Sequence, residues 1–213
     1  MKLTKHEHSC VVLDSGGASV VIDPGSFSPG AAEIIAGADA ILLTHEHMDH
    51  VNEAAINAAL AARSDLRVYA PAALSATFAG NADQFTAVAP GDALNLASFS
   101  ITVHGGEHAL IHRDIPVAAN VGYLVNGTLY HPGDSFFVPA ADIPVLLLPT
   151  SGPWMKIGEA ADFVRAVKPQ QIVQIHELLL SDIGLFLADN LLGAQGLTGL
   201  PLTAIPAGDS VSF

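Results

Sequence analysis

Three histidines and one aspartate occur within six positions of this chain, in the string Thr44-His45-Glu46-His47-Met48-Asp49-His50. Residues 40–44, just before the histidines, form an apolar run typical of a strand buried on both faces. The carboxyl ends of such strands are where α/β proteins place their sites. His45 and His47 lie two apart in an extended segment and project the same way, so both can bind one cation. Asp49 and His50 follow at the start of the next predicted helix and point to a second cation.

The string also begins like the H-E-x-x-H pattern of helical zinc proteases, through His45-Glu46. The residue four after His45 is Asp49, and no metal-bearing helix is expected here. The zinc-protease interpretation is therefore set aside.

Further along the chain come three short motifs: Gly106-Glu107-His108-Ala109, Pro132-Gly133-Asp134-Ser135 and Gln174-Ile175-His176. Together with the histidine-rich string, they resemble the ordered metal-binding motifs of the metallo-β-lactamase superfamily, and the resemblance covers nearly the whole chain. Within that superfamily the chain is similar to the bacterial branch that includes ascorbate-6-phosphate lactonase, through its opening residues His8-Ser9-Cys10-Val11 and its turn Ile22-Asp23-Pro24-Gly25.

The resemblance implies seven ligands to two divalent metal ions. It implies that the first ion is held by His45, His47 and His108, that the second is held by Asp49, His50 and His176, and that Asp134 bridges both. No ligand of the pattern is missing, which disfavours relatives that have lost catalysis. The flavo-diiron proteins, which carry a carboxylate at the position of His47, are disfavoured for the same reason.

The chemistry of such a centre is hydrolysis. A donor set of nitrogen and oxygen without thiolate suits zinc, the predicted metal, and it also accepts manganese, iron or nickel. Manganese is the second choice because the lactonase branch implies it. Two dications about 3.5 to 4 Å apart share one water and lower its pKa from about 15.7 toward neutrality, so a bridging hydroxide exists at pH 7. Asp49, His108 and Asp134 are predicted to be catalytic, and Asp49 is expected to orient the attacking water.

The predicted substrate is a small molecule with a lactone or another activated carbonyl, because of the branch that the chain resembles. A phosphodiester, including RNA, is the alternative, because the same metals stabilise either transition state. Eight Lys plus Arg against 21 Asp plus Glu give a net charge of −13, which makes a nucleic-acid partner unfavourable. A metal-binding sensor module without turnover is a third alternative, which the complete ligand set disfavours.

Four further residues are candidates for substrate contacts. His112 and Arg113 fall in a loop just after His108, where a cation could bind a substrate anion. His131 lies three residues before Asp134, and a structural hydrogen bond is an equally good interpretation for it. Trp154, the only tryptophan, either lines a pocket or packs in the core.

Three other residues near the motifs, His8, Asp23 and Cys10, are expected to have structural roles. His8 is predicted to be a hydrogen-bonded structural imidazole, with support of a metal ligand as the alternative. Asp23 is predicted to fix a turn near the site, again with a contact to a ligand as the alternative. Cys10 is predicted to be a small buried hydrophobic residue.

These side chains need a layered fold to position them. Helices are predicted over residues 31–36, 51–63, 71–79, 157–167 and 178–192. Strands are predicted over residues 9–14, 20–23, 40–44, 66–70, 93–96, 99–104, 117–125, 128–131, 145–148, 171–175 and 202–205. Both halves run through strands first and then alternating helices and strands, which suggests two α-covered sheets stacked face to face. The prediction is an α/β protein with the four-layer αβ/βα sandwich that the family resemblance implies, the metallo-β-lactamase fold.

Length and composition agree with this fold. The 213 residues, half of them apolar, are enough for one domain over residues 1–213 with a substantial core. Every apolar run is interrupted well before the roughly 18 to 20 residues that a membrane span needs. A single cysteine and the lack of an apolar signal segment at the start predict a cytoplasmic location. The sequence leaves the formation of a homo-oligomer open.

Overall fold

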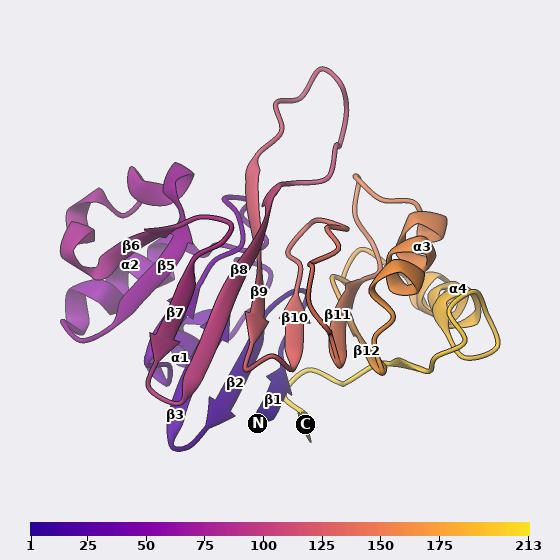
Figure 1. Cartoon of the computed structure of the whole chain (residues 1–213). Coiled ribbons are helices and arrows are strands. Elements are labelled where there is room, and N and C mark those ends of the chain that lie inside the picture. Colours follow the sequence, from indigo (N-terminus) through magenta and orange to yellow (C-terminus); the bar gives the residue numbers. More distant parts are fainter.

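A computed structural model of the chain describes residues 1–213 as two seven-stranded β-sheets (Figure 1). The first sheet contains β1 (Lys2–Lys5), β2 (Val11–Ser15), β3 (Ala18–Ile22), β4 (Ala40–Leu42), β5 (Arg67–Pro71), β6 (Phe85–Val88) and β14 (Ser210–Ser212). The second sheet contains β7 (Ala93–Leu96), β8 (Phe99–Glu107), β9 (Ala119–Val125), β10 (Leu129–His131), β11 (Val145–Pro149), β12 (Gln171–Ile175) and β13 (Leu202–Thr203).

The two sheets have matching topologies. The strand orders are β14-β1-β2-β3-β4-β5-β6 and β13-β12-β11-β10-β9-β8-β7. In the first sheet, pairing is antiparallel from β14 to β3 and parallel from β3 to β6. In the second sheet, it is antiparallel from β7 to β10 and parallel from β10 to β13. Each half of the chain therefore begins with antiparallel strands and continues with parallel ones.

Helices cover the outer faces of both sheets. The helices are α1 (Ala31–Ala36), α2 (Glu53–Ala62), α3 (Ile157–Val167) and α4 (Asp182–Leu192), with two 3₁₀ segments, η1 (Ala72–Ser75) and η2 (Ala79–Gln84). The first two α-helices pack on the first sheet and the last two on the second, each pair over its own apolar cluster. None of the four α-helices combines the length and the hydropathy that a membrane span requires.

A third apolar cluster lies between the sheets and shows why β4 is apolar throughout. Leu42 belongs to the cluster between the sheets, whereas Ile41 and Leu43 belong to the cluster under α1 and α2. Successive side chains of a strand point to opposite faces, so a strand with layers on both sides must be apolar at every position. The predicted four-layer αβ/βα sandwich is thus confirmed.

Two predicted helices differ from the structure. The helix predicted over 71–79 is wrong, since only the 3₁₀ turn η1 forms there. Leu74 and Phe78 both enter the cluster under α2, so tertiary packing overrides the helical preference of this segment. The helix predicted over 178–192 begins only at Asp182, because the Ser181 hydroxyl accepts a hydrogen bond from the Gly184 N–H and caps it.

Other predictions agree closely with the observed elements. The helices predicted over 31–36 and 157–167 and the strand over 171–175 coincide with α1, α3 and β12. The short strands β1, β6 and β14 were not predicted, because their few residues give too little alternation. Between β8 and β9, residues 108–118 form a long loop that projects beyond the body of the molecule, here named the arm (Figure 1).

Candidate metal centre

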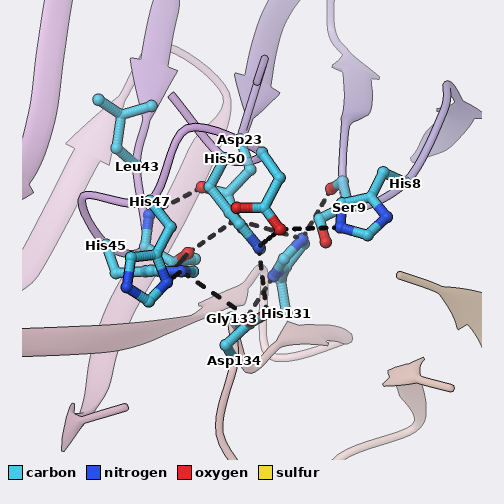
Figure 2. Close-up of polar contacts among 12 residues, drawn as sticks. His8, Ser9, Asp23, Leu43, His45, His47, His50, His131, Gly133 and Asp134 are labelled. Atoms are coloured by element: carbon cyan, nitrogen blue, oxygen red, sulfur yellow. Dashed lines mark hydrogen bonds and ion pairs between the residues drawn. The ribbon is translucent and has the colours of Figure 1, made fainter. Parts of the chain in front are cut away.

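The predicted ligands come from loops that follow strands of both sheets. The first sheet contributes the histidine-rich string after β4, and His8, which was not among the predicted ligands, lies between β1 and β2. The second sheet contributes His108 after β8, Asp134 after β10 and His176 after β12. Figure 2 shows His45 and His47 on one side of Asp23 and His50, with His8 on the other.

Two hydrogen bonds hold the sheets in register at this point. The Val121 N–H of β9 donates to the carbonyl of Thr44, at 2.9 Å. The Tyr123 hydroxyl, also on β9, donates to the carbonyl of Leu43, at 2.8 Å. The end of β4, which presents the histidine-rich string, is therefore tied directly to the second sheet.

One group of four side chains, named the first half-site, consists of His45, His47, His108 and Asp134. Each offers one ligand atom, and these atoms lie within 4.8 Å of one another. The Nε2 atoms of His108 and His45 lie 3.4 and 4.0 Å from Asp134 Oδ2. The three residues implied for the first metal and the implied bridging carboxylate are thus brought together.

A second group, named the second half-site, consists of His8, Asp49, His50 and His176, again with ligand atoms within 4.8 Å of one another. Asp49 Oδ2 lies 3.1 Å from His8 Nε2, 3.5 Å from His176 Nε2 and 3.7 Å from His50 Nε2. The three residues implied for the second metal therefore converge, and His8 joins them.

Asp134 contacts both groups. Besides its contacts with His45 and His108, its Oδ1 lies 3.1 Å from His50 Nε2 and its Oδ2 lies 3.1 Å from His176 Nε2. One carboxylate thus faces imidazoles from both half-sites, which is the position that a bridging ligand needs.

The donor atoms fit divalent metal ions. Several are fully buried and make no hydrogen bond, among them His50 Nε2, His108 Nε2, Asp134 Oδ1 and both ring nitrogens of His176. Buried polar atoms without partners are costly, so such a concentration of them needs an explanation. A cation shared by imidazole nitrogens and carboxylate oxygens that face one another would be the missing partner of these atoms and would offset this cost.

Polar partners behind the imidazoles fix which ring nitrogen faces the centre. The Nδ1–H of His50 donates to Asp23 Oδ2 at 2.7 Å, and the Nδ1–H of His108 donates to the Ala109 carbonyl at 2.6 Å. His45 Nδ1 lies 2.9 Å from the Thr44 hydroxyl. Nε2 of each ring consequently faces the centre, where that of His45 lies 3.1 Å from Nδ1 of His47, another ring nitrogen of the first half-site.

Asp23 does more than the turn role predicted for it. Its backbone has a positive φ of 52°, which is consistent with a turn. Its carboxylate also accepts hydrogen bonds from the Thr44 N–H at 2.8 Å, from the Thr44 hydroxyl at 2.7 Å and from His50. Asp23 thereby bonds Thr44, which contacts His45 of the first half-site, and also bonds His50 of the second. A contact between Asp23 and a metal ligand was the less favoured of the two predictions for this residue.

Asn120 and Gly133 position Asp134. The Asn120 amide donates to the Pro132 carbonyl at 2.9 Å and accepts from the Asp134 N–H at 3.0 Å. Gly133 has a φ of 64°, and a Cβ there would lie 2.3 Å from Asn120 Oδ1. Sequence reasoning missed Asn120, although an amide at the start of an apolar strand is a signal that could have indicated it.

His8 was predicted to be structural, and the structure places it at the second half-site. The side chain is fully buried, and its ring centre lies 3.7 Å from that of His176. Its carbonyl accepts a hydrogen bond from the His176 N–H at 3.1 Å. The loop before β2 and the loop after β12 are therefore joined through His8.

Two predicted substrate contacts are used inside the protein. The indole N–H of Trp154, which is 7% exposed, donates to Asp134 Oδ2 at 2.7 Å. His131 is fully buried, its Nε2–H donates to the Ser9 carbonyl at 2.9 Å, and its Nδ1 accepts from the Gly133 N–H. The polar atoms of both side chains are therefore already bonded within the protein, and a role of either in substrate binding stays a prediction.

The other two predicted substrate contacts lie on the arm. His112 and Arg113 are exposed; His112 Nδ1 accepts a hydrogen bond from the Asp114 N–H at 3.2 Å, and Arg113 forms an ion pair with Asp114 at 3.7 Å. The structure does not bring either side chain into one of the half-sites.

Burial and charge set the protonation of the centre. Burial, reinforced by His50, lowers the pKa of His45 well below its usual value, so this ring is neutral as a ligand must be. Burial opposes a charge on His50, but Asp134 and Asp23 outweigh it and raise the pKa of His50 well above its usual value. Burial also opposes ionisation of Asp49, yet the neighbouring imidazoles of His176 and His8 outweigh it and lower the pKa of Asp49. A proton on His50 therefore competes with a cation.

Solvent reaches the centre beside the middle of the histidine-rich string. Among the eight residues of the half-sites, only His47 and Asp49 are partly exposed, and the Asp49 side chain is 19% accessible. The other six are buried. The opening of the centre is therefore bracketed by these two residues.

Comparisons with known proteins place the chain in a family. The family described as the beta-lactamase superfamily domain matches residues 2–176. Protein Rv0786c of Mycobacterium tuberculosis is 40% identical over 85% of this chain and 86% of its own length. A UPF0173 metal-dependent hydrolase of Myxococcus xanthus is 32% identical over 79% of this chain and 67% of its own length. Igni18, a metallo hydrolase from Ignicoccus hospitalis, has a similar fold, with a TM-score of 0.74 at 20% identity, over 100% of this chain and 97% of its own.

Proposed function

Because the chain belongs to the metallo-β-lactamase superfamily and to its UPF0173 metal-dependent hydrolase family, we propose that it hydrolyses a small molecule with a lactone or another activated carbonyl at a dinuclear metal centre. That the protein is a metal-dependent hydrolase follows from the family. The observation that supports two ions is the contact of Asp134 with imidazoles of both half-sites.

The ligand set favours zinc, with manganese, iron or nickel as alternatives. Bound divalent ions would lower the pKa of a shared water and polarise the carbonyl oxygen of the substrate. The predicted cytoplasmic location and the organisation of residues 1–213 as one domain stay predictions.

The protein's own side chains would orient this chemistry. Asp49 lies at the opening and is ionised, so it can accept a hydrogen bond from the attacking water and hold it toward the substrate. His8 lies 3.1 Å from the same carboxylate and restricts its rotation. Trp154 does the same for Asp134 through its indole N–H. These bonds preorganise both carboxylates before a substrate arrives.

The test combines metal content with a substrate panel. Protein stripped by a chelator is reloaded with zinc or manganese, and bound metal is counted by elemental analysis. The panel contains lactones, aryl esters, bis(p-nitrophenyl) phosphate and RNA. We expect two equivalents of metal and metal-dependent turnover of the carbonyl substrates.

The matched controls are two Asp→Asn variants. Asp134→Asn removes the charge that faces both half-sites, and we expect it to lose metal and turnover. Asp162→Asn changes a carboxylate that is 80% exposed on α3, and we expect it to keep both. Turnover of the phosphodiester alone, or full metal loading without any turnover, would contradict the proposed function.

A further inference from the structure

Exposed large apolar side chains are distributed very unevenly over this chain. Among residues 1–109 there is only one, Met48, which is 64% exposed. It lies between His47 and Asp49, the two residues that bracket the opening of the centre. The most exposed apolar side chain of the first half of the protein thus stands at its entrance.

The other loops that carry ligands repeat this pattern. Leu110 follows His108 by two residues and is 58% exposed. Leu178 and Leu179 follow His176 and are 46% and 56% exposed. Consecutive Cα atoms are about 3.8 Å apart, so the Cα atoms of Leu110 and Leu178 lie within about 8 Å of those of the ligands.

The arm extends this apolar surface. Ile115 and Val117, on its returning limb, are 46% and 49% exposed. The base of the arm is fixed to the centre, because the Ala109 N–H donates to the Asp134 carbonyl at 2.8 Å and the His108 N–H donates to the Ala118 carbonyl at 2.9 Å. Figure 1 shows the arm rising from the ends of β8 and β9.

We name this surface the apolar rim, which consists of Met48, Leu110, Ile115, Val117, Leu178 and Leu179. Core packing does not require these side chains, since the apolar clusters of the sandwich do not include them. Exposed large apolar residues gathered near a reactive centre mark a binding surface. We therefore expect the apolar rim to bind a ligand or a partner.

The charges around the rim favour a neutral occupant. The exposed charged residues beside the ligands include Glu46 and Glu107, and Arg113 on the arm is paired with Asp114. Together with the net charge of −13, this repels anionic groups such as phosphates or acidic lipid headgroups.

We infer that the apolar rim selects neutral substrates whose activated carbonyl carries a hydrocarbon chain. This inference rests on the proposed function and specifies its substrate class. The carbonyl is held at the opening beside His47 and Asp49, and the chain lies against Leu110 on one side and Leu178 on the other. Contact with the rim removes apolar surface from water and lowers the KM for longer chains.

The first measurement is a chain-length series. Metal-loaded protein hydrolyses p-nitrophenyl esters from acetate to octanoate, each below the concentration at which it aggregates. Complete burial of one methylene is worth at most about fourfold. Because the rim is open to solvent, we expect kcat/KM to rise about twofold per methylene.

The second measurement uses variants of exposed residues, which should fold normally. Leu110→Ser and the double variant Leu178→Ser/Leu179→Ser should each lower the octanoate-to-acetate ratio of kcat/KM about fivefold. Ile183→Ser is the matched control, because Ile183 is 72% exposed on α4 and is not one of the six rim residues, and it should keep the wild-type ratio. Equal ratios in the rim variants and the wild type would overturn the inference.

A binding measurement separates this inference from the proposed function. Alkyl trifluoromethyl ketones of four to ten carbons are neutral and carry an activated carbonyl. Their dissociation constants are read from the fluorescence of Trp154, the only tryptophan, which contacts Asp134. Affinity that rises with chain length supports the inference about the apolar rim even if no ester is hydrolysed. Hydrolysis that does not depend on chain length overturns this inference and leaves the proposed function intact.

Two further results would assign the rim to another occupant. A dimer in light scattering that dissociates in the Leu178→Ser/Leu179→Ser variant would mean that a second copy covers it. Sedimentation with phosphatidylcholine vesicles that is lost in the same variant would mean that it docks on a membrane. Either result overturns the inference.

Discussion

The two half-sites use the same kinds of donor but are supported by different partners. In the first half-site, His45 and His108 are oriented by a hydroxyl and a backbone carbonyl, which are neutral. Each half-site has one carboxylate among its members, Asp134 in the first and Asp49 in the second, but in the second half-site His50 is also oriented by the carboxylate of Asp23. The second half-site therefore concentrates more negative charge around its cation.

The difference in supporting charge predicts a difference in affinity. A carboxylate hydrogen-bonded to a ligating imidazole raises the basicity of the ring and strengthens its bond to a metal. The three imidazoles of the second half-site are buried and only its carboxylate, Asp49, is partly exposed, whereas the first half-site exposes an imidazole, His47. We expect the second half-site to hold its ion more tightly and the first to exchange its ion more readily.

The largest effect is expected from removing one ligand of each half-site. His108→Ala and His50→Ala should each lower kcat/KM on the order of a thousandfold, because each leaves one metal position incomplete. Elemental analysis after dialysis should find about one tightly bound equivalent in His108→Ala and less in His50→Ala. Equal retention of metal by the two variants would contradict the predicted difference in affinity between the half-sites.

Metal removal should reveal the same order without mutation. Chelator titration of the wild type should release the ion of the first half-site before that of the second. A site that is saturated about a hundredfold above its Kd adds about 2.7 kcal/mol to stability. For a chain of this size we expect Tm to fall by roughly 5 to 10 °C per ion lost. A single release step with one fall in Tm would show that the half-sites do not differ.

Asp23→Asn tests the supporting carboxylate directly. The amide keeps the size of the side chain but loses the charge that faces His50, so affinity at the second half-site should fall about 10- to 100-fold. Asp39→Asn is the control, because Asp39 bonds the Ser19 N–H on the surface of the first sheet. Competition with a metallochromic indicator gives both affinities, and equal values for the two variants would exclude a role for the Asp23 charge.

The smallest effect is expected from His8→Asn. His8 has a φ of 60°, a conformation that asparagine tolerates, so the variant should fold. Asp49 loses the contact at 3.1 Å, and we expect about a tenfold loss of affinity at the second half-site. The absorption spectrum of the cobalt-loaded protein should change for that site only. An unchanged spectrum would leave His8 with the structural role predicted from the sequence.

Much of the fold could be predicted from local patterns. The helix over 157–167 has apolar side chains at helical spacing, and the strand over 171–175 is apolar enough to be buried on both faces. The histidine-rich string indicated metal binding by residue type and spacing alone. The prediction of secondary structure failed where a strand is short, as in β1, and where tertiary packing determines the conformation, as in residues 71–79.

The sequence by itself determined which residue types could bind metal, the order of their motifs and the layered fold that follows from periodicity. The tertiary structure alone decided that His8 joins Asp49, that Asp23 supports His50 and that Trp154 holds Asp134. The physical reason is the range of the interactions. Periodicity and turn chemistry are set by residues within a few positions, whereas the hydrogen bonds from His8, Asp23 and Trp154 join side chains 20 to 41 positions apart. Such contacts exist only once the strands that carry these loops have paired within each sheet.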